Sequence, residues 1–425
     1  MWLIGYARQS TFLARLSKQN RHQLNHVKLL LYSHDWAPSI GGVQTSLMLL
    51  AEGLTNRSSR EMRGLGASFE VTLVTQTPRG EMNDAALPYR VVRSPKPFQL
   101  LRLIREADLL HLAGVSLVPL SIGWLLRKHI VIEHHFYDAI CPNGLLFYEP
   151  LQKPCSGHFL ARRYRECVRC NSGVSGFWKS VRRLGLTFPR HWLTQRVAGN
   201  IAISAHVCDR LNLPRSEVIY YGVRDLSLDP SEIQCPSYPL QFAYVGRLVS
   251  IKGVHLILEA ARKLHEHGIP FHVQLIGDGP ERSRLEAMSA AFGLKDRMDF
   301  LGFQEGKDLQ DAVHKVDVVL MPSIWEETAG LAAMEQMMRG KATIVADIGG
   351  LAEVVADTGL KFPYGDADAL AACMKRFVDD PDLVRRFGEA ARARALSLFN
   401  EEQRVAARGE FYVQIGHRTN STRRN

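Results

Sequence analysis

Two glutamates have the type and spacing to hold a polyhydroxylated ligand. Glu327 and Glu335 lie eight positions apart in the stretch WEETAGLAAMEQMMRG. The apolar run before them predicts a buried strand, so Glu327 falls on the following loop and Glu335 in the second turn of a helix that begins near Gly330. The first amides of that helix, at Gly330, Leu331 and Ala332, lack partners within the helix and can bind ligand oxygens. Each carboxylate can accept hydrogen bonds from a vicinal diol.

Two basic residues follow another predicted strand, in FAYVGRLVSIKGV. The strand ends at Gly246, and Arg247 and Lys252 lie on the loop after it. Fixed cations at a strand end suit a diphosphate leaving group, because negative charge builds on it as its bond to a sugar breaks. Gly277, in LIGDGPE, lies in a strand-to-helix turn where a backbone can approach a nucleotide, although the third glycine of a dinucleotide fingerprint is missing. The alternative is that these acids and bases are solvated surface charges.

The first half of the chain contributes a glycine pair and a histidine pair. Gly41 and Gly42 precede a predicted helix in PSIGGVQ, which suits either a second phosphate-approach loop or a simple turn. His134 and His135 end an apolar strand in IVIEHHFYD. We interpret them either as substrate contacts or as structural side chains.

Alternating strands and helices must position these residues. The strand-length apolar runs are VKLLLYSH, FEVTLVTQ, ADLLHLAG, KHIVIEHH and GNIAISAH, and then LQFAYVGRL, FHVQLIGDG, RMDFLGF, VDVVLMPS, KATIVADIG and GLKFPYGD. Continuous apolar strands separated by helices predict parallel sheets. With 425 residues the chain exceeds one core. We therefore expect an α/β protein of two doubly wound, Rossmann-like domains that face each other across a cleft, with ligands at the carboxyl ends of the strands.

The same pattern divides the chain into six parts. We expect a basic N-terminal extension over 1–27, a first domain over 28–222 with a cysteine-rich insertion over 141–170, a Ser- and Pro-rich linker over 223–239, a second domain over 240–396, an amphipathic C-terminal helix over 397–416 and a basic tail over 417–425.

The charge balance favours a polyanionic partner. The formal net charge is +10 and the isoelectric point is near 9.3, which suits nucleic acid, an anionic membrane surface or a phosphate-bearing substrate. The first 34 residues contain no Asp or Glu, which fits a membrane-surface helix or a disordered start. No apolar run is long enough to span a membrane and no signal peptide is present, so we expect a cytoplasmic protein.

Four cysteines fall in the insertion: Cys141, Cys155, Cys167 and Cys170. A C-x2-C pair in a cytoplasmic protein is typical of structural zinc, and the alternative is four reduced thiols.

A basic and aromatic segment follows the insertion. FWKSVRRLGLTFPRHW mixes Trp178, Phe188 and Trp192 with Arg and Lys. This composition suits docking at an anionic membrane, or a cationic helix face whose aromatic side chains lie in the core.

Taken in order, the motifs resemble glycosyltransferase family 4, whose members are retaining, nucleotide-sugar-dependent enzymes of the GT-B fold. The stretches IGGVQ, ISAHVCDRL, VGRLVSIKGV, LIGDGPE and PSIWEETAGLAAMEQMMRG followed by GG occur in the family's order, from Lys28 to about Phe411. The resemblance implies an acceptor-binding first domain, a donor-binding second domain and a C-terminal helix that crosses back to the first.

The resemblance also implies roles for matching positions. The donor's diphosphate would be held by three residues: Arg247, Lys252 and Gly42. Glu335 would bind the ribose hydroxyls, and Glu327 with the amides after Thr328 would bind the transferred sugar. His135 would contact the sugar near the reacting carbon.

Two positions depart from the family pattern. Tyr221 in YGVRD stands where relatives carry asparagine, so the contact at the domain crossover is open. Phe136 stands where many relatives carry aspartate, which leaves the sugar contact there open.

The implied function is hexosyl transfer from a nucleoside-diphosphate sugar, without a catalytic metal. The acceptor would be a glycan or a polyprenyl-diphosphate-linked glycan of a cell-surface polysaccharide such as exopolysaccharide, capsule or lipopolysaccharide. Such an enzyme would be cytoplasmic or peripheral on the inner membrane, and we expect no nucleic acid partner. Two alternatives stay open: a nucleotide-sugar 2-epimerase of the same fold and a non-catalytic basic binding protein. The donor's base and sugar stay open as well.

Overall fold

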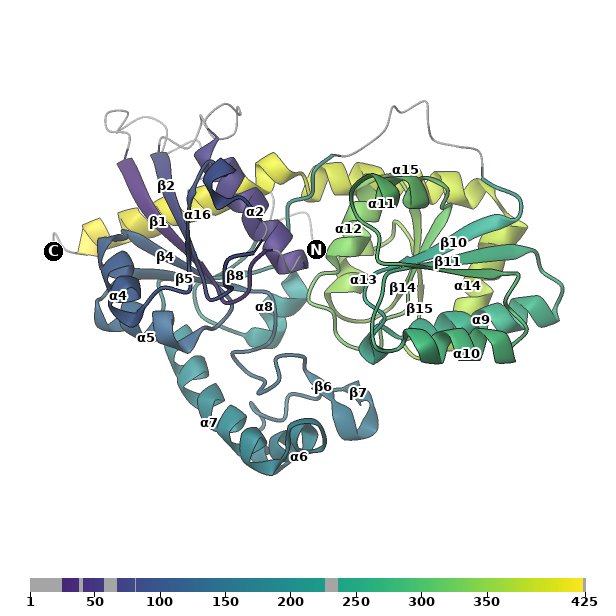
Figure 1. Cartoon of the computed structure of the whole chain (residues 1–425), viewed down its shortest axis with the longest axis horizontal. Helices are drawn as coiled ribbons and strands as arrows, with labels where there is room; N and C mark the ends of the chain where they lie inside the picture. Colours follow the sequence, from purple (N-terminus) through teal and green to yellow (C-terminus); the bar gives the residue numbers. More distant parts are fainter. Residues whose placement is uncertain (1–24, 38–40, 57–66, 81, 226–235, 423–425) are drawn as a thin grey trace.

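Two α/β domains lie side by side in the computed structural model, which describes residues 25–37, 41–56, 67–80, 82–225 and 236–422 (Figure 1). Each domain has its own parallel sheet, and one long C-terminal helix runs from the second domain along the first. The predicted pair of doubly wound domains is confirmed. Residues 1–24 of the extension expected over 1–27, and residues 226–235 of the linker expected over 223–239, lie outside the described residues.

The first domain is built on a seven-stranded parallel sheet in the order β3-β2-β1-β4-β5-β8-β9. Its strands are β1 (Asn25–Ser33), β2 (Ala67–Thr75), β3 (Arg90–Arg93), β4 (Leu109–Ala113), β5 (His129–His134), β8 (Gly199–Ala202) and β9 (Ser216–Val218). Its helices are α2 (Gly42–Thr55), α4 (Pro97–Glu106), α5 (Leu117–Leu125) and α8 (Ala205–Leu211).

Both faces of this sheet are covered. Leu29 and Leu31 of β1 pack in a core with α2 and the C-terminal helix, whereas Leu30 and Tyr32 pack in a core with α4 and α5. Because side chains alternate along a strand, a continuous apolar run fills two cores. This explains why the sequence pattern predicted a doubly wound domain.

The second domain repeats the design with a six-stranded sheet in the order β12-β11-β10-β13-β14-β15. Its strands are β10 (Leu240–Val245), β11 (Phe271–Ile276), β12 (Met298–Gly302), β13 (Val318–Met321), β14 (Ala342–Ala346) and β15 (Leu360–Phe362). Its helices are α9 (Val254–Glu266), α10 (Arg282–Ala291), α11 (Gly306–His314), α12 (Leu331–Met338), α13 (Gly349–Val355), α14 (Ala367–Asp379) and α15 (Asp382–Leu398).

The cysteine-rich segment and α7 form a lobe below the first sheet (Figure 1). It contains a two-stranded hairpin, β6 (Phe147–Tyr148) with β7 (Lys153–Pro154), and the helices α6 (Tyr164–Ser175) and α7 (Phe177–Thr194). Helices α6 and α7 pack against each other, and α7 also contacts α5.

The C-terminal helix α16 (Glu401–Thr422) covers the first domain. The chain crosses between domains at Val223 and Asn400, which pair in a short parallel bridge. Val405 then packs on Gly53 of α2, and Phe411 packs on Gly199 of β8. The helix continues to Thr422, so the boundary expected at 416 was wrong: residues 417–422 extend the helix instead of forming a separate tail.

Candidate active site

The acid predicted on the loop after β13 is buried and paired with a predicted base. Glu327 is 4% exposed, and its Oε1 lies 2.8 Å from the ammonium of Lys252. The hydroxyl of Ser323 donates to the same oxygen. Lys252 ends the short turn η4 (Ser250–Lys252), which follows β10, and its ammonium lies 5.8 Å from the ring centroid of Trp325. The loops that follow two neighbouring strands thus bring opposite charges together.

Backbone contacts from three directions fix the loop that carries Glu327. The amide of Gly350 donates to the carbonyl of Glu327 over 2.6 Å, and the amide of Ile324 donates to the carbonyl of Ile251, within the turn η4, over 3.0 Å. From the first domain, the hydroxyl of Ser204 donates to the carbonyl of Thr328. In the sequence, only Gly349 and Gly350 at the start of α13 could have indicated that this loop is held in place.

Gly246 and Gly277 pack directly against each other, while Arg247 is exposed at the end of β10. A Cβ at Gly277 would lie 1.9 Å from the carbonyl oxygen of Gly246, and Gly277 has a φ of +143°. This close approach of two loops by itself requires glycine at position 277, whether or not a ligand binds there. The contact of Gly277 with a nucleotide stays a prediction.

The helix after the loop begins where the sequence indicates. Gly330 precedes α12, and the amides of Leu331 and Ala332 make no hydrogen bond within the part of the chain that is described. Burial raises the pKa of Glu335 above its usual value, and Arg339 opposes this shift only in part. Glu335 therefore favours a ligand that donates hydrogen bonds to it.

The glycine pair of the first domain meets this same helix. Gly41 precedes α2 and Gly42 is its first residue. A Cβ at Gly42 would lie 3.2 Å from Cδ2 of Leu331, so the starts of α2 and α12 touch across the domain interface. The N-terminal ends of both helices therefore lie close to one another.

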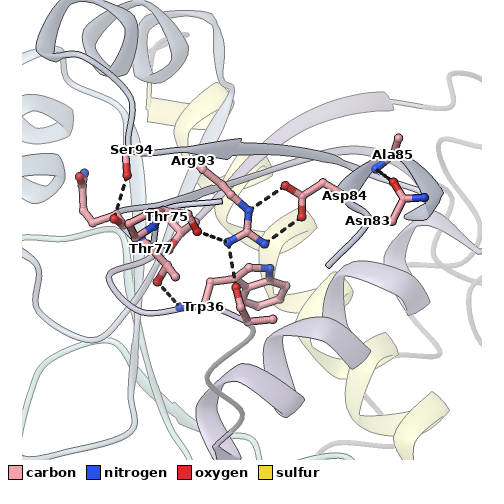
Figure 2. A network of polar contacts seen from close by, with 11 residues as sticks. Trp36, Thr75, Thr77, Asn83, Asp84, Ala85, Arg93 and Ser94 are labelled. Carbon is pink, nitrogen blue, oxygen red and sulfur yellow. Dashed lines mark hydrogen bonds and ion pairs between the residues drawn. The ribbon is translucent and has the colours of Figure 1, made fainter. Parts of the chain in front are cut away.

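A polar network anchors the loop that leads from β1 toward Gly41 (Figure 2). Arg93 donates two hydrogen bonds to Asp84, of 2.7 and 2.8 Å, and a third of 2.8 Å to the carbonyl of Ala37. The amide of Trp36, whose side chain is fully buried, donates to Thr77 over 2.8 Å. The hydrogen bonds from Arg93 hold the pKa of Asp84 below its usual value, so this ion pair persists at neutral pH.

The two histidines differ in their surroundings, although both are buried. His134 is hydrogen-bonded to Asn200 of the neighbouring strand over 2.9 Å, which supports a structural role. His135 is hydrogen-bonded through Nδ1 to the hydroxyl of Tyr221 over 2.8 Å, and the two rings stack with centroids 5.7 Å apart. Its Nε2 has no partner among the described residues. Tyr221, at the position that departs from the family pattern, thus orients His135.

Acid is expected to destabilise the fold between about pH 6.5 and pH 4. Burial lowers the pKa of both His134 and His135 from 6.5 to about 4. In this window the unfolded chain binds protons that the folded chain excludes, so the free energy of unfolding falls as pH falls. Each histidine contributes about 3 kcal/mol over the whole window. Urea denaturation at pH 7.0, 6.0 and 5.0 should show a smaller decrease for His135→Gln than for the natural chain, and an equal decrease would contradict this assignment.

Glu326, the neighbour of Glu327, links the two domains, which sequence reasoning missed. Its carboxylate lies 2.8 Å from Nε of Arg210 and 3.1 Å from Nε2 of His206, and its carbonyl accepts from Tyr137 over 3.1 Å. Nothing in the sequence distinguishes this interface residue from the adjacent acid, because its partners lie more than 100 residues away.

A second acid, Glu353 of α13, caps a helix of the other domain. Its carboxylate accepts from the amides of Ala205 and His206, over 2.8 and 2.7 Å, and from the hydroxyl of Tyr220. These amides begin α8 and would otherwise lack partners. The two domains are therefore joined by polar contacts on the side of the cleft next to Glu327.

The four cysteines of the insertion are buried and form no disulfide bond among the described residues, and zinc binding by them stays a prediction. Across the described ranges no three His, Cys, Asp or Glu side chains are grouped to hold a metal ion, so the zinc prediction has no geometrical support. Burial raises the pKa of Cys141 to about 11 and that of Cys167 to about 12, which keeps both thiols protonated. Cys170 contacts the carbonyl of Phe147 over 3.3 Å. The alternative of reduced core thiols fits these contacts.

The basic and aromatic segment forms α7. Trp178 is 80% exposed, whereas Phe188 packs on Phe159 and Trp192 packs on Trp124 of α5. The start of the helix therefore exposes its aromatic side chain at Trp178, whereas Phe188 and Trp192 further along the helix are partly packed against other rings. None of the helices in the described part of the chain is long and apolar enough to cross a membrane.

Comparisons with known proteins agree with this geometry. The family model described as glycosyl transferases group 1 matches residues 229–394. The 2-deoxystreptamine glucosyltransferase of Streptomyces kanamyceticus is 36% identical over 355 residues, which are 76% of this chain and 88% of that protein. The putative colanic acid biosynthesis glycosyltransferase WcaL of Escherichia coli K12 is 30% identical over 203 residues, which are 45% of this chain and 50% of that protein. The structure of Anabaena Alr3699/HepE in complex with UDP and glucose has a TM-score of 0.66 at 18% identity, covering 92% of this chain and 100% of that chain.

Two facing Rossmann-like domains of this arrangement form the GT-B fold. The extent and identity of the match to the deoxystreptamine enzyme then settle the family. The chain belongs to the glycosyl transferases group 1 family.

Proposed function

We propose that the protein is a retaining glycosyltransferase of family 4 that transfers a hexose from a nucleoside-diphosphate sugar to a glycan or lipid-linked acceptor of a cell-surface polysaccharide. The observation that carries this proposal is the contact between Lys252 and the buried Glu327 at the domain interface. The relative named for colanic acid biosynthesis supports the pathway class. We place the enzyme in the cytoplasm.

In this proposal the donor lies between the start of α12 and the strand ends of the second domain. Arg247 and Lys252 hold the diphosphate, the free amides of Leu331 and Ala332 with Glu327 hold the sugar, and Glu335 accepts hydrogen bonds from the ribose. The bond from the anomeric carbon to the diphosphate breaks, the acceptor oxygen bonds to the same face of that carbon, and the acceptor's proton passes to the leaving phosphate. The two cations stabilise the negative charge that develops on the leaving group.

His135 is assigned to the sugar in the same proposal. Its Nε2 is buried without a protein partner, so a sugar hydroxyl could supply the missing hydrogen bond. Because burial lowers its pKa to about 4, the ring is neutral at pH 7 and contributes polarity without adding charge.

A thermal-shift panel of UDP, GDP and ADP sugars tests the donor assignment. One nucleotide class should stabilise the protein, by about 2.7 kcal/mol at a concentration 100 times Kd. Glu335→Gln should weaken that ligand about tenfold, because a hydrogen bond to a neutral amide is weaker than one to a carboxylate. The ligand-free variant should be at least as stable as the natural chain, since a buried charge is removed. No stabilisation by any nucleotide sugar would refute the proposal.

The product formed from the donor distinguishes a glycosyltransferase from the alternative, a nucleotide-sugar 2-epimerase. A labelled donor incubated without any acceptor should remain unchanged if the protein transfers sugar to an acceptor. Release of a free epimer would favour the epimerase instead.

We also propose that α7 rests on an anionic membrane. Trp178 and Phe177 are exposed at one end of this helix, beside the exposed cations Lys179, Arg182 and Arg183. Exposed aromatic and basic side chains together suit the interface of a bilayer with anionic lipids. An acceptor anchored in that bilayer would then lie next to the cysteine-rich lobe.

A further inference from the structure

A cavity of about 770 Å³ lies between the cysteine-rich lobe and the second domain. The lobe contributes β6, β7 and α6 to its walls, and the second domain contributes Glu326 and Tyr364. This volume is in the range that holds a small-molecule ligand. The cavity is separate from the donor contacts described above.

The cavity carries an excess of positive charge. Arg210 is already paired with Glu326 at 2.8 Å, and Glu166 accepts a hydrogen bond from Tyr148. Three further cations line the cavity, are exposed and form no ion pair within the described residues: Lys153, Arg163 and Arg169. In addition, Nδ1 of His158 is buried there without a hydrogen-bond partner.

The arrangement of the three cations suits a multiply charged group. Lys153 lies in β7, Arg163 precedes α6, and Arg169 lies one to two turns into that helix. A carboxylate is satisfied by one guanidinium, whereas a phosphate or diphosphate offers several oxygens to donors from different directions. The charge therefore favours phosphate chemistry over a single carboxylate.

The position of the cavity connects it with the transfer site. Glu326 forms part of its wall, and the next residue is Glu327. Arg210 connects the second domain with the lobe, because it contacts Glu326 and also donates a hydrogen bond to the carbonyl of Cys155 in the lobe over 2.8 Å. A ligand in the cavity would thus lie next to the loop that carries Glu327.

We propose that this cavity binds a phosphate or diphosphate group of the acceptor, and that this group belongs to a lipid carrier. The proposal rests on the proposed glycosyl transfer for the identity of the ligand as acceptor. The exposed apolar side chain of Leu151 at the cavity and the nearby α7 provide a path from the phosphate to a membrane.

Binding of inorganic pyrophosphate tests the cavity without depending on activity. Calorimetry is done in an Arg247→Ala background, which weakens pyrophosphate binding at the donor site. The triple variant K153A/R163A/R169A should bind pyrophosphate at least tenfold more weakly than this background. The matched control K295A/K307A/K315A removes three exposed lysines from the second domain and should change the affinity less than twofold. Equal affinity in the triple variant, or an equal loss in the control, would overturn the proposal.

Activity and vesicle measurements then identify the source of the phosphate. With Arg247 restored, the cavity variant should raise the KM for the acceptor at least tenfold and leave the thermal shift by the nucleotide sugar unchanged. A loss of that thermal shift would point to the donor site and contradict the assignment. Phosphatidylcholine vesicles that contain a polyprenyl diphosphate should compete with pyrophosphate, whereas competition by soluble glycosyl phosphates alone would overturn the lipid carrier.

Discussion

Replacing Glu327 with glutamine is expected to lower the rate of sugar transfer by about 10²- to 10³-fold, the range seen when one preorganised electrostatic contact is removed from an active site. The carboxylate is buried and contacts Lys252, so its loss removes the anion that positions this ammonium. In the proposed donor complex it also removes an acceptor for the hydroxyls of the sugar. The measurement is kcat with labelled donor under saturating acceptor.

Two comparisons make this expectation specific. Glu389→Gln removes a carboxylate from an exposed ion pair on α15 and should leave the rate unchanged. Thermal melting should show that Glu327→Gln remains folded. Full turnover by a folded Glu327→Gln protein would remove Glu327 from the reaction.

Replacing Arg408 with methionine is expected to lower the free energy of unfolding by about 3–5 kcal/mol, since a buried charge is left without its partner. Arg408 and Glu133 form a fully buried ion pair between α16 and β5, and Arg408 also donates to the carbonyl of Tyr220 over 3.0 Å. Burial alone would raise the pKa of Glu133, but Arg408 and His111 outweigh it and hold the pKa well below its usual value. The ion pair thus stabilises the fold at neutral pH and loses this effect as acid protonates Glu133. Urea denaturation at pH 7 measures the change.

A double substitution separates the ion pair from simple packing. Glu133→Gln combined with Arg408→Met leaves no unpaired charge, so it should be more stable than Arg408→Met alone. If Arg408→Met lies within 0.5 kcal/mol of the natural chain, α16 is not held by this pair.

The architecture and much of the site geometry follow from local patterns. The apolar runs that form β10 and β13 place Lys252 and Glu327 on neighbouring loops, because parallel strands end at the same edge of a sheet. The start of α12 at Leu331 follows from Gly330, whose left-handed φ of +81° ends the preceding loop. Such features depend on residues close in sequence.

The contacts between domains could not be predicted in this way. Glu326 pairs with Arg210 across more than 100 residues, and no local signal separates it from Glu327. The same holds for Tyr221, because its hydrogen-bond partner His135 lies far away in the sequence and the contact at the crossover was left open. The C-x2-C pattern leaves the choice between zinc and reduced thiols open for a different reason, since buried thiols suit a core as readily as a metal site.

The return of α16 across the interface means that the first domain is discontinuous along the chain. A fragment that stops before Glu401 would leave Leu29, Leu31 and Phe69 without the helix that shields them, and would expose that apolar surface to water. Anyone who wishes to produce the first domain alone must therefore graft residues 401–422 back onto it through an artificial connection.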